Sequence, residues 1–178
     1  ANADDAKKIE EVLKECDFKV ESIQTKNVKR NPPTPFITST LQQEASKRLR
    51  FSAKQTMRTA QGLYERGLIT YMRTDSVNLS KESLSSAKKW IQKELGKNYL
   101  LEEPRIFKTK SRLAQEAHEA IRPTNPDFAP KFFGGEVDFE EKNEERLYDL
   151  IWRRFIASQL PQAIFNATSI NILAIHEY

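Results

Sequence analysis

The sequence has little cysteine and glycine and no long apolar run, and each shortage excludes a class of protein. Its single cysteine, Cys16, excludes an intrachain disulfide and a zinc site built from several cysteines. The five glycines form no pattern that cradles nucleotide phosphates. No apolar run approaches the roughly 20 residues of a membrane helix, and the polar start of the chain does not resemble a signal peptide. We therefore expect a cytoplasmic protein with no membrane partner.

Charge is unevenly distributed along the 178 residues, although the formal net charge is only +4. Residues 44–73 carry seven basic and two acidic side chains, whereas residues 136–149 carry seven acidic and two basic ones. A basic stretch of this kind favours a polyanionic partner such as nucleic acid. An ordinary solvated helix face has the same composition, so charge alone does not decide between them.

Proline-bearing stretches at residues 32–35 and at Pro161 divide the chain into three segments, because proline continues neither a helix nor a central strand. Before the first stop, spacing predicts a helix and then a strand, and after the second stop alternation predicts a returning strand. Cys16 lies on the apolar side of the first helix and is expected to be a small core residue. The expected domains are 1–32, 33–160 and 161–178; the expected outer elements are a helix at 4–16 and strands at 18–25 and 163–175.

The middle segment is expected to be mainly helical. Thr40-x-x-Gln43 and Ser52-x-x-Gln55 are candidate caps for two successive helices, and Gly67 is placed to end the second. Ser80 is a candidate cap for a third helix that ends at Gly96. We also expect an exposed basic loop at 97–114 that includes Arg105, a short helix at 115–121 and a long helix at about 140–159.

Tyr71 and Arg73 lie two residues apart in Gly67-Leu-Ile-Thr-Tyr71-Met-Arg73-Thr-Asp75-Ser76, a segment predicted to be a short strand. Residues i and i+2 of a strand point to the same face. A guanidinium can bind phosphate oxygens while a neighbouring phenol attacks phosphorus. At neutral pH roughly one phenol in a thousand is ionised, so a nearby cation would help the attack. On spacing alone, a packing tyrosine beside a solvated arginine is the better explanation, because Tyr-x-Arg often occurs by chance.

Three separated strings resemble the catalytic-tyrosine region of the type IA DNA topoisomerases, in the order of that family. They are PPTPFITSTLQQEAS, GLITYMRTDS and QEAHEAIRPT, and the resemblance covers roughly residues 30–160. Met72 and Val77-Asn78-Leu79-Ser80 favour the bacterial topoisomerase I branch over topoisomerase III and reverse gyrase.

The resemblance implies roles for individual residues. Tyr71 would be the nucleophile that forms a phosphotyrosine bond with a DNA 5′ end, and Arg73 would contact the scissile phosphate. His118 and Arg122 would contact DNA, and a helical i, i+4 spacing would place them side by side. The family's Mg²⁺ is held by a separate N-terminal domain that no part of this chain resembles. No metal site is therefore expected here, and Asp75 is expected to cap or orient Arg73.

The implied fold is mainly α with β: a helical catalytic-tyrosine domain with a winged-helix-like unit, inserted between strands of a β-rich hinge domain. The implied partners are single-stranded DNA, underwound duplex DNA and the missing N-terminal metal-binding domain of the same protein. The full enzyme would relax negatively supercoiled DNA through a 5′-phosphotyrosine intermediate without ATP, and the fragment alone would be inactive.

Two other classes of protein fit part of the pattern. Two helices followed by a strand also describe a non-enzymatic winged-helix DNA-binding domain, in which Tyr71 would have no role. A tyrosine recombinase is a weaker alternative, because its tyrosine comes late in the catalytic domain whereas Tyr71 comes early.

Overall fold

The computed structural model describes residues 2–107 and 119–176, which divide into two compact units. One unit comprises Ala1–Arg30 with Ala163–Tyr178, and the other comprises Asn31–Gln162. No helix within the described ranges is long and apolar enough to cross a membrane. The elements are α1 (Ala3–Lys14), β1 (Asp17–Arg30), α2 (Thr38–Leu49), α3 (Ala53–Glu65), α4 (Lys81–Glu94), the 3-10 turns η1 (Lys97–Tyr99) and η2 (Lys131–Phe133), α5 (Lys142–Ser158) and β2 (Ala163–Ile175).

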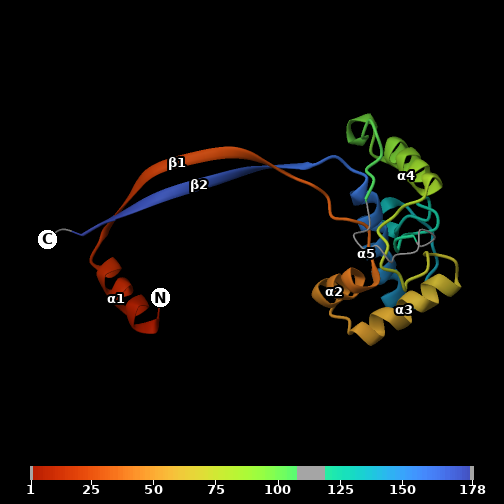
Figure 1. Ribbon diagram of the computed structural model, residues 1–178, viewed down its shortest axis with the longest axis horizontal. Helices are drawn as coiled ribbons and strands as arrows, with labels where there is room; N and C mark the ends of the chain where they lie inside the picture. The colour runs from red at the N-terminus through yellow and green to blue at the C-terminus, as the bar shows by residue number, and fades with distance from the viewer. Residues whose placement is uncertain (1, 108–118, 177–178) are drawn as a thin grey trace. The chain divides into compact units, whose positions relative to one another are not determined.

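The first unit contains a two-stranded antiparallel sheet in which β1 pairs with β2 along its length (Figure 1). The register runs from Asp17 opposite Ile175 to Arg30 opposite Ala163, with an irregularity between Val20 and Ser22. Both predicted strands are confirmed. The first continues to Arg30 because pairing with β2 satisfies backbone groups in a polar stretch whose sequence alone does not favour a strand.

The predicted first helix is confirmed as α1, whose N-terminus is capped by the Asn2 side chain accepting from the Asp5 amide. The expectation that Cys16 is a core residue is wrong. Cys16 is only half-buried, its Sγ lies 3.2 Å from the Val12 carbonyl, and no residue of α1 is buried. The apolar side of α1 therefore has no layer packed on it among the residues that the structure describes.

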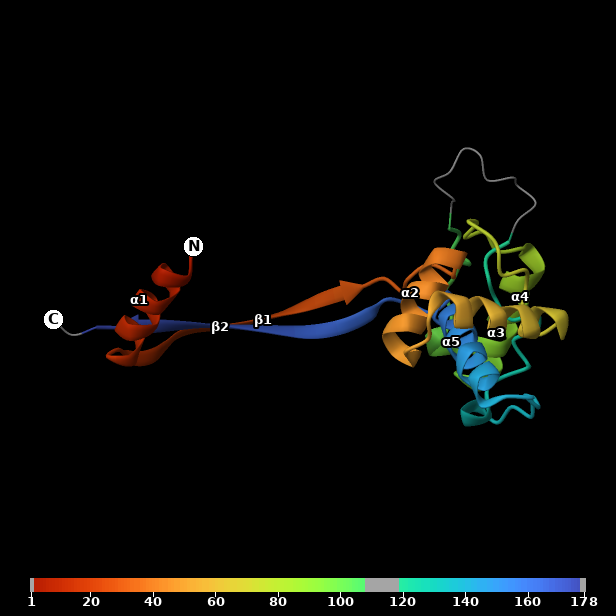
Figure 2. The ribbon, with the colours of Figure 1, turned by 90° about the horizontal axis from the view of Figure 1, so that it is seen from below.

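The second unit is built on α5, which packs against both α2 and α3, while α2 and α3 also contact one another (Figure 2). This arrangement buries the apolar stripes that the sequence periodicity predicted, because each helix turns its apolar side to a neighbour. The fully buried side chains of this core include Phe36, Leu41, Leu63, Ile69, Met72, Ile91, Ile121, Leu147, Ile151, Trp152 and Phe155.

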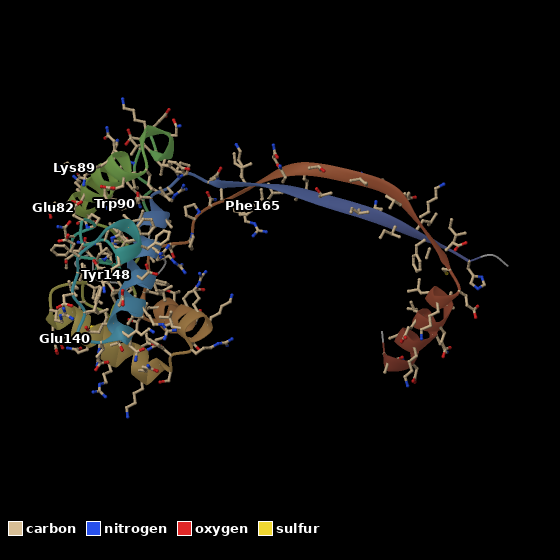
Figure 3. The ribbon with its side chains drawn as sticks, turned by 180° about the vertical axis from the view of Figure 1, so that it is seen from behind. Glu82, Lys89, Trp90, Glu140, Tyr148 and Phe165 are labelled. Atoms are coloured by element: carbon tan, nitrogen blue, oxygen red, sulfur yellow. The ribbon has the colours of Figure 1, made fainter. Side chains whose placement is uncertain are left out.

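Aromatic side chains link α4 and α5 within this unit. The Trp152 ring on α5 lies 4.7 Å from Trp90 on α4 and 4.9 Å from Phe133, and its Nε1 donates to the Pro126 carbonyl. Tyr148 on α5 is buried, which raises the pKa of its phenol, and its hydroxyl donates to the Phe128 carbonyl. Figure 3 labels Trp90 and Tyr148 in this unit and Phe165 on β2.

Two of the three predicted N-caps are present in the structure. The side chains of Ser52 and Ser80 accept from the amides of Gln55 and Ser83, so these two N-caps are confirmed. The predicted cap at Thr40 is wrong: α2 begins at Thr38, and Thr40 Oγ1 instead accepts from the amide of Ile37, the residue just before the helix. Ile37 has an extended backbone and is itself the N-cap residue, so the helix begins at Thr38 and not after Thr40.

The C-terminus of α3 forms a Schellman motif. The Gly67 amide donates to the Tyr64 carbonyl and the Leu68 amide to the Leu63 carbonyl, and Gly67 has a φ of +69°. Leu63 and Leu68 are both buried, which supplies the apolar contact of this motif. The prediction that Gly67 ends the helix is confirmed, because the turn needs a left-handed residue.

Two loop predictions need correction where the structure describes them. Arg105 does not lie in an exposed basic loop, because its backbone and guanidinium bond to Gln159, Leu160 and Asn31. The short helix expected at 115–121 is absent from its described residues, 119–121. There Ile121 forms a bridge with Phe36, and this tertiary pairing keeps the backbone extended. Residues 108–118 lie outside the described ranges.

Candidate active site around Tyr71

Tyr71 lies in an irregular segment that bends at Thr70, Met72 and Arg73 and whose side chains alternate between exposed and buried. Tyr71, Arg73 and Asp75 are exposed, whereas Met72, Thr74 and Ser76 are buried. Tyr71 and Arg73 are thus both exposed, as a common face would require. The predicted strand is not formed, because within the described residues this segment forms only an isolated bridge between Ile69 and Pro123. The β-wing expected after the second helix is likewise not formed in that part of the chain.

One side of the segment is held by Thr38, the first residue of α2. Its Oγ1 lies 2.8 Å from the Met72 carbonyl and 3.0 Å from the Thr74 carbonyl, to either of which it donates, and it accepts from the Thr74 amide at 2.9 Å. The Thr38 amide also donates to the Thr74 carbonyl. These bonds replace a strand ladder and fix the backbone on either side of Arg73.

We expect the Thr38→Val variant to lose about 1–3 kcal/mol of unfolding free energy, because it leaves buried backbone groups of Met72 and Thr74 without a partner. Urea unfolding measures this loss. Thr34→Val is the matched control, since Thr34 is exposed and no side-chain hydrogen bond holds it to the described residues. Equal stability of the two variants would contradict the importance of this contact.

The other side of the segment is held through Thr70. Its Oγ1 donates to the Ala120 carbonyl at 2.7 Å and accepts from the Arg122 amide at 3.0 Å, and its own amide donates to the Arg122 carbonyl. Tyr71 thus sits between two anchored residues, Thr70 and Met72, while 47% of its own surface stays exposed. The backbone is fixed and the phenol is accessible.

An open groove of about 400 Å³ is lined by the start of α2 and by Arg73, Thr74 and Asp75. The expected contact between Asp75 and Arg73 is not formed. Among the described residues, neither side chain makes an ion pair or a side-chain hydrogen bond. The Arg73 guanidinium is therefore available to an anionic ligand from outside this part of the chain.

The structure describes only one of the two residues that the third sequence string suggested. His118 lies outside the described residues, so its DNA contact stays a prediction. Arg122 is described, and its guanidinium bonds to the Glu119 carboxylate at 2.5 Å and to the Pro123 carbonyl at 2.9 Å. Residues 119–122 are not helical, so the helical spacing assumed for the pair does not hold at its described end.

The described residues do not fit a Mg²⁺ site of their own. No group of three histidine, cysteine, aspartate or glutamate side chains is gathered within the described ranges. Asp75 supplies a single exposed carboxylate beside Tyr71, whereas a magnesium site usually combines one or two carboxylates with phosphate and water oxygens. We derive no chemical step through a metal held by this chain.

Sequence reasoning missed the residues that anchor the segment: Thr38, Thr70 and Glu119. Glu119 joins two parts of the site, because its carboxylate accepts from the Ser80 amide at the start of α4 and from Arg122. A threonine next to the candidate nucleophile was a visible signal for Thr70. Nothing in the local sequence pairs Thr38 with residues more than thirty positions away.

An exposed tyrosine and an unengaged arginine on an anchored segment form a site suited to attack on a phosphodiester. The family model described as DNA topoisomerase matches residues 1–178. DNA topoisomerase 1 of Rickettsia felis is 49% identical over 173 residues, which cover 93% of this chain and 22% of that protein. The corresponding protein of Campylobacter jejuni is 48% identical over 171 residues, which cover 92% of this chain and 24% of that protein.

A solved structure, full-length topoisomerase I from Thermotoga maritima, superposes with a TM-score of 0.66 at 32% identity, covering 98% of this chain and 30% of that one. The chain belongs to the DNA topoisomerase family, in its bacterial topoisomerase I group. It spans about a quarter or less of the length of the curated relatives named here. The winged-helix alternative is not favoured.

Proposed function

We propose that this chain supplies the tyrosine half of the active site of a bacterial DNA topoisomerase I. Tyr71 would cut one strand of DNA and hold its 5′ phosphate while another strand passes, and the strand would then be resealed. The observation that carries this proposal is the anchored, exposed pair of Tyr71 and Arg73 at the centre of a family match that covers the whole chain.

In the cleavage step, the Tyr71 hydroxyl oxygen bonds to phosphorus and the phenol gives up its proton. The bond from phosphorus to the 3′ oxygen breaks, and that oxygen leaves with the electron pair and takes up a proton. Resealing is the reverse attack by the 3′ hydroxyl. Because one phosphate ester replaces another, the exchange needs no ATP.

Arg73 would act on the phosphoryl oxygens during this step. A preorganised cation stabilises charge that develops in the transition state, and the planar guanidinium fork matches the geometry of phosphate oxygens. Its freedom from ion pairs within the described residues supports this role, since a guanidinium already paired with a carboxylate would have to exchange partners first. His118 and Arg122 remain proposed DNA contacts of the same site.

We also propose that the Mg²⁺ site and the rest of the hinge domain lie in segments of the longer protein outside this chain. Mg²⁺ would be held by an N-terminal domain outside this chain, because the described residues offer no site for it. Residues 1–32 and 161–178 would be strands of a β-rich hinge domain into which residues 33–160 are inserted. Large apolar side chains such as Phe18 and Ile172 are more than half exposed on the two-stranded sheet, which supports further strands or helices covering them.

Covalent capture tests the proposed function. The chain is mixed with a separately made N-terminal metal-binding domain of a bacterial topoisomerase I, Mg²⁺ and a labelled single-stranded oligonucleotide. We expect label on the 178-residue band after denaturing electrophoresis and a phosphotyrosine adduct at residue 71 by mass spectrometry. The chain alone should neither capture label nor relax supercoiled DNA. No adduct from a mixture that binds DNA would contradict the proposal.

Arg73 variants test the second residue. We expect Arg73→Ala to slow formation of the adduct by about 10²–10³-fold, the usual cost of losing one transition-state contact. Arg73→Lys should recover part of the rate, because it keeps the charge but loses the planar fork. Arg58→Ala is the control. Arg58 lies on α3 and lines a different pocket from Arg73, so this variant removes the same charge from another place. Equal rates for the two alanine variants would exclude a role for Arg73 at the phosphate.

A further inference from the structure

A second tyrosine touches the proposed nucleophile. Tyr64, in the last turn of α3, lies with its ring centroid 5.2 Å from that of Tyr71, and the two ring planes meet at 64°. This edge-to-face arrangement is a favoured contact between aromatic rings. The contact was not expected from the sequence, where six residues and a helix end lie between the two tyrosines.

Hydrogen bonds hold the backbone at several positions between the two tyrosines. The Schellman motif at Gly67 reverses the chain after Tyr64, the Ile69 bridge to Pro123 holds it extended, and Thr70 anchors it to Ala120 and Arg122. The Tyr71 side chain therefore leaves the backbone from a fixed point, close to the ring of Tyr64. Rotation about its two side-chain torsions, χ1 and χ2, is the freedom that remains.

The contact restrains the Tyr71 ring without engaging its oxygen. Among the described residues, neither phenol makes a hydrogen bond, so Tyr64 offers Tyr71 an apolar surface rather than a donor or acceptor. A hydrogen bond to the Tyr71 oxygen would have to break before that oxygen reached phosphorus. A ring edge limits orientation and leaves the oxygen free.

Packing in the core does not account for the position of the Tyr64 side chain. It is 40% exposed, whereas Tyr148 is fully buried and hydrogen-bonded. Tyr99 is a useful comparison, since it is 51% exposed and has no ring partner among the described residues.

We propose that Tyr64 is a positioning residue whose ring holds the Tyr71 phenol in the orientation needed for attack on phosphorus. This inference rests on the proposed function of Tyr71. A nucleophile displaced by about 1 Å can cost 10²-fold in rate, so removing the ring should slow cleavage while leaving DNA binding and folding intact.

The test uses the reconstituted capture reaction at saturating oligonucleotide with Tyr64→Phe, Tyr64→Leu and Tyr99→Leu. We expect Tyr64→Phe and Tyr99→Leu to form the adduct within about threefold of the wild-type rate, and Tyr64→Leu to be slower by about 10–100-fold. The oligonucleotide Kd should be the same for all four proteins. In NMR spectra of tyrosine-labelled chain, the Tyr71 ring protons should keep their ring-current shift in Tyr64→Phe and lose it in Tyr64→Leu.

The outcomes separate this inference from the proposed function. If the wild-type chain forms the adduct and Tyr64→Leu forms it equally fast, the positioning role is wrong and the nucleophile assignment stands. A weaker Kd with an unchanged saturated rate would also overturn it, because Tyr64 would then stack on a base. Equal slowing of Tyr64→Phe and Tyr64→Leu would assign the effect to the hydroxyl instead. Absence of the wild-type adduct would overturn the proposed function, and this inference with it.

Discussion

We expect the Tyr71→Phe variant to form no detectable covalent complex with DNA in the reconstituted reaction, while it still binds the oligonucleotide with wild-type affinity. The substitution removes only the hydroxyl oxygen that would bond to phosphorus and leaves the ring against Tyr64. Because Tyr71 is 47% exposed and its hydroxyl has no partner among the described residues, the unfolding free energy should change by no more than about 0.5 kcal/mol.

Denaturing electrophoresis with labelled oligonucleotide measures the adduct, and circular dichroism in urea measures the fold. Tyr99→Phe is the matched control, because it removes the same atom from a similarly exposed tyrosine and should capture label at the wild-type rate. Label that persists on Tyr71→Phe would mean that another residue is the nucleophile. Label lost together with the fold would mean that the hydroxyl is structural.

The largest loss of stability is expected from Trp152→Ala. The Trp152 side chain is 1% exposed, contacts the rings of Trp90 and Phe133, and donates to the Pro126 carbonyl. Removing so large a buried ring costs about 3–5 kcal/mol, and the unpaired carbonyl adds about 1–3 kcal/mol. Domains are typically stable by about 5–15 kcal/mol, so this variant should unfold at much lower urea concentration or fail to fold.

Phe132→Ala is the control for this prediction, because Phe132 is also aromatic and neighbours Phe133 but is 80% exposed. It should change the unfolding free energy by less than about 1 kcal/mol. Trp152→Phe keeps most of the ring volume and removes the donor, so its loss of stability should fall between those of the two alanine variants. A Trp152→Ala protein as stable as Phe132→Ala would contradict the packing described here.

The sequence predicted the helices of this chain well, because their signals are local. The serines at positions 52 and 80 and the glycine at position 67 define helix ends through contacts within a few residues of themselves. The alternating exposure of Tyr71, Met72 and Arg73 also matches the period of two expected for this segment.

What the sequence could not provide depends on contacts between distant residues. The Tyr71 segment was expected to pair in a sheet, yet Thr38 and Thr70 satisfy its backbone instead. Arg122 was expected to lie on a short helix, but residues 119–122 are not helical, and the Arg122 guanidinium pairs with the Glu119 carboxylate. Neither outcome follows from propensity or spacing, and both concern the surroundings of the proposed nucleophile.

The two ends of the helical unit are tied together. The Gln162 side chain donates to Asn31 at 2.8 Å, and Arg105 bonds both to Asn31 and to the Leu160 carbonyl. The first and last residues of this unit, Asn31 and Gln162, therefore lie close together. A segment whose ends are close can be inserted into a surface turn of another protein without separating the residues on either side of that turn. When residues 31–162 are inserted into a surface turn of an unrelated carrier protein, we expect them to fold there and to keep the Tyr71 and Arg73 side chains exposed.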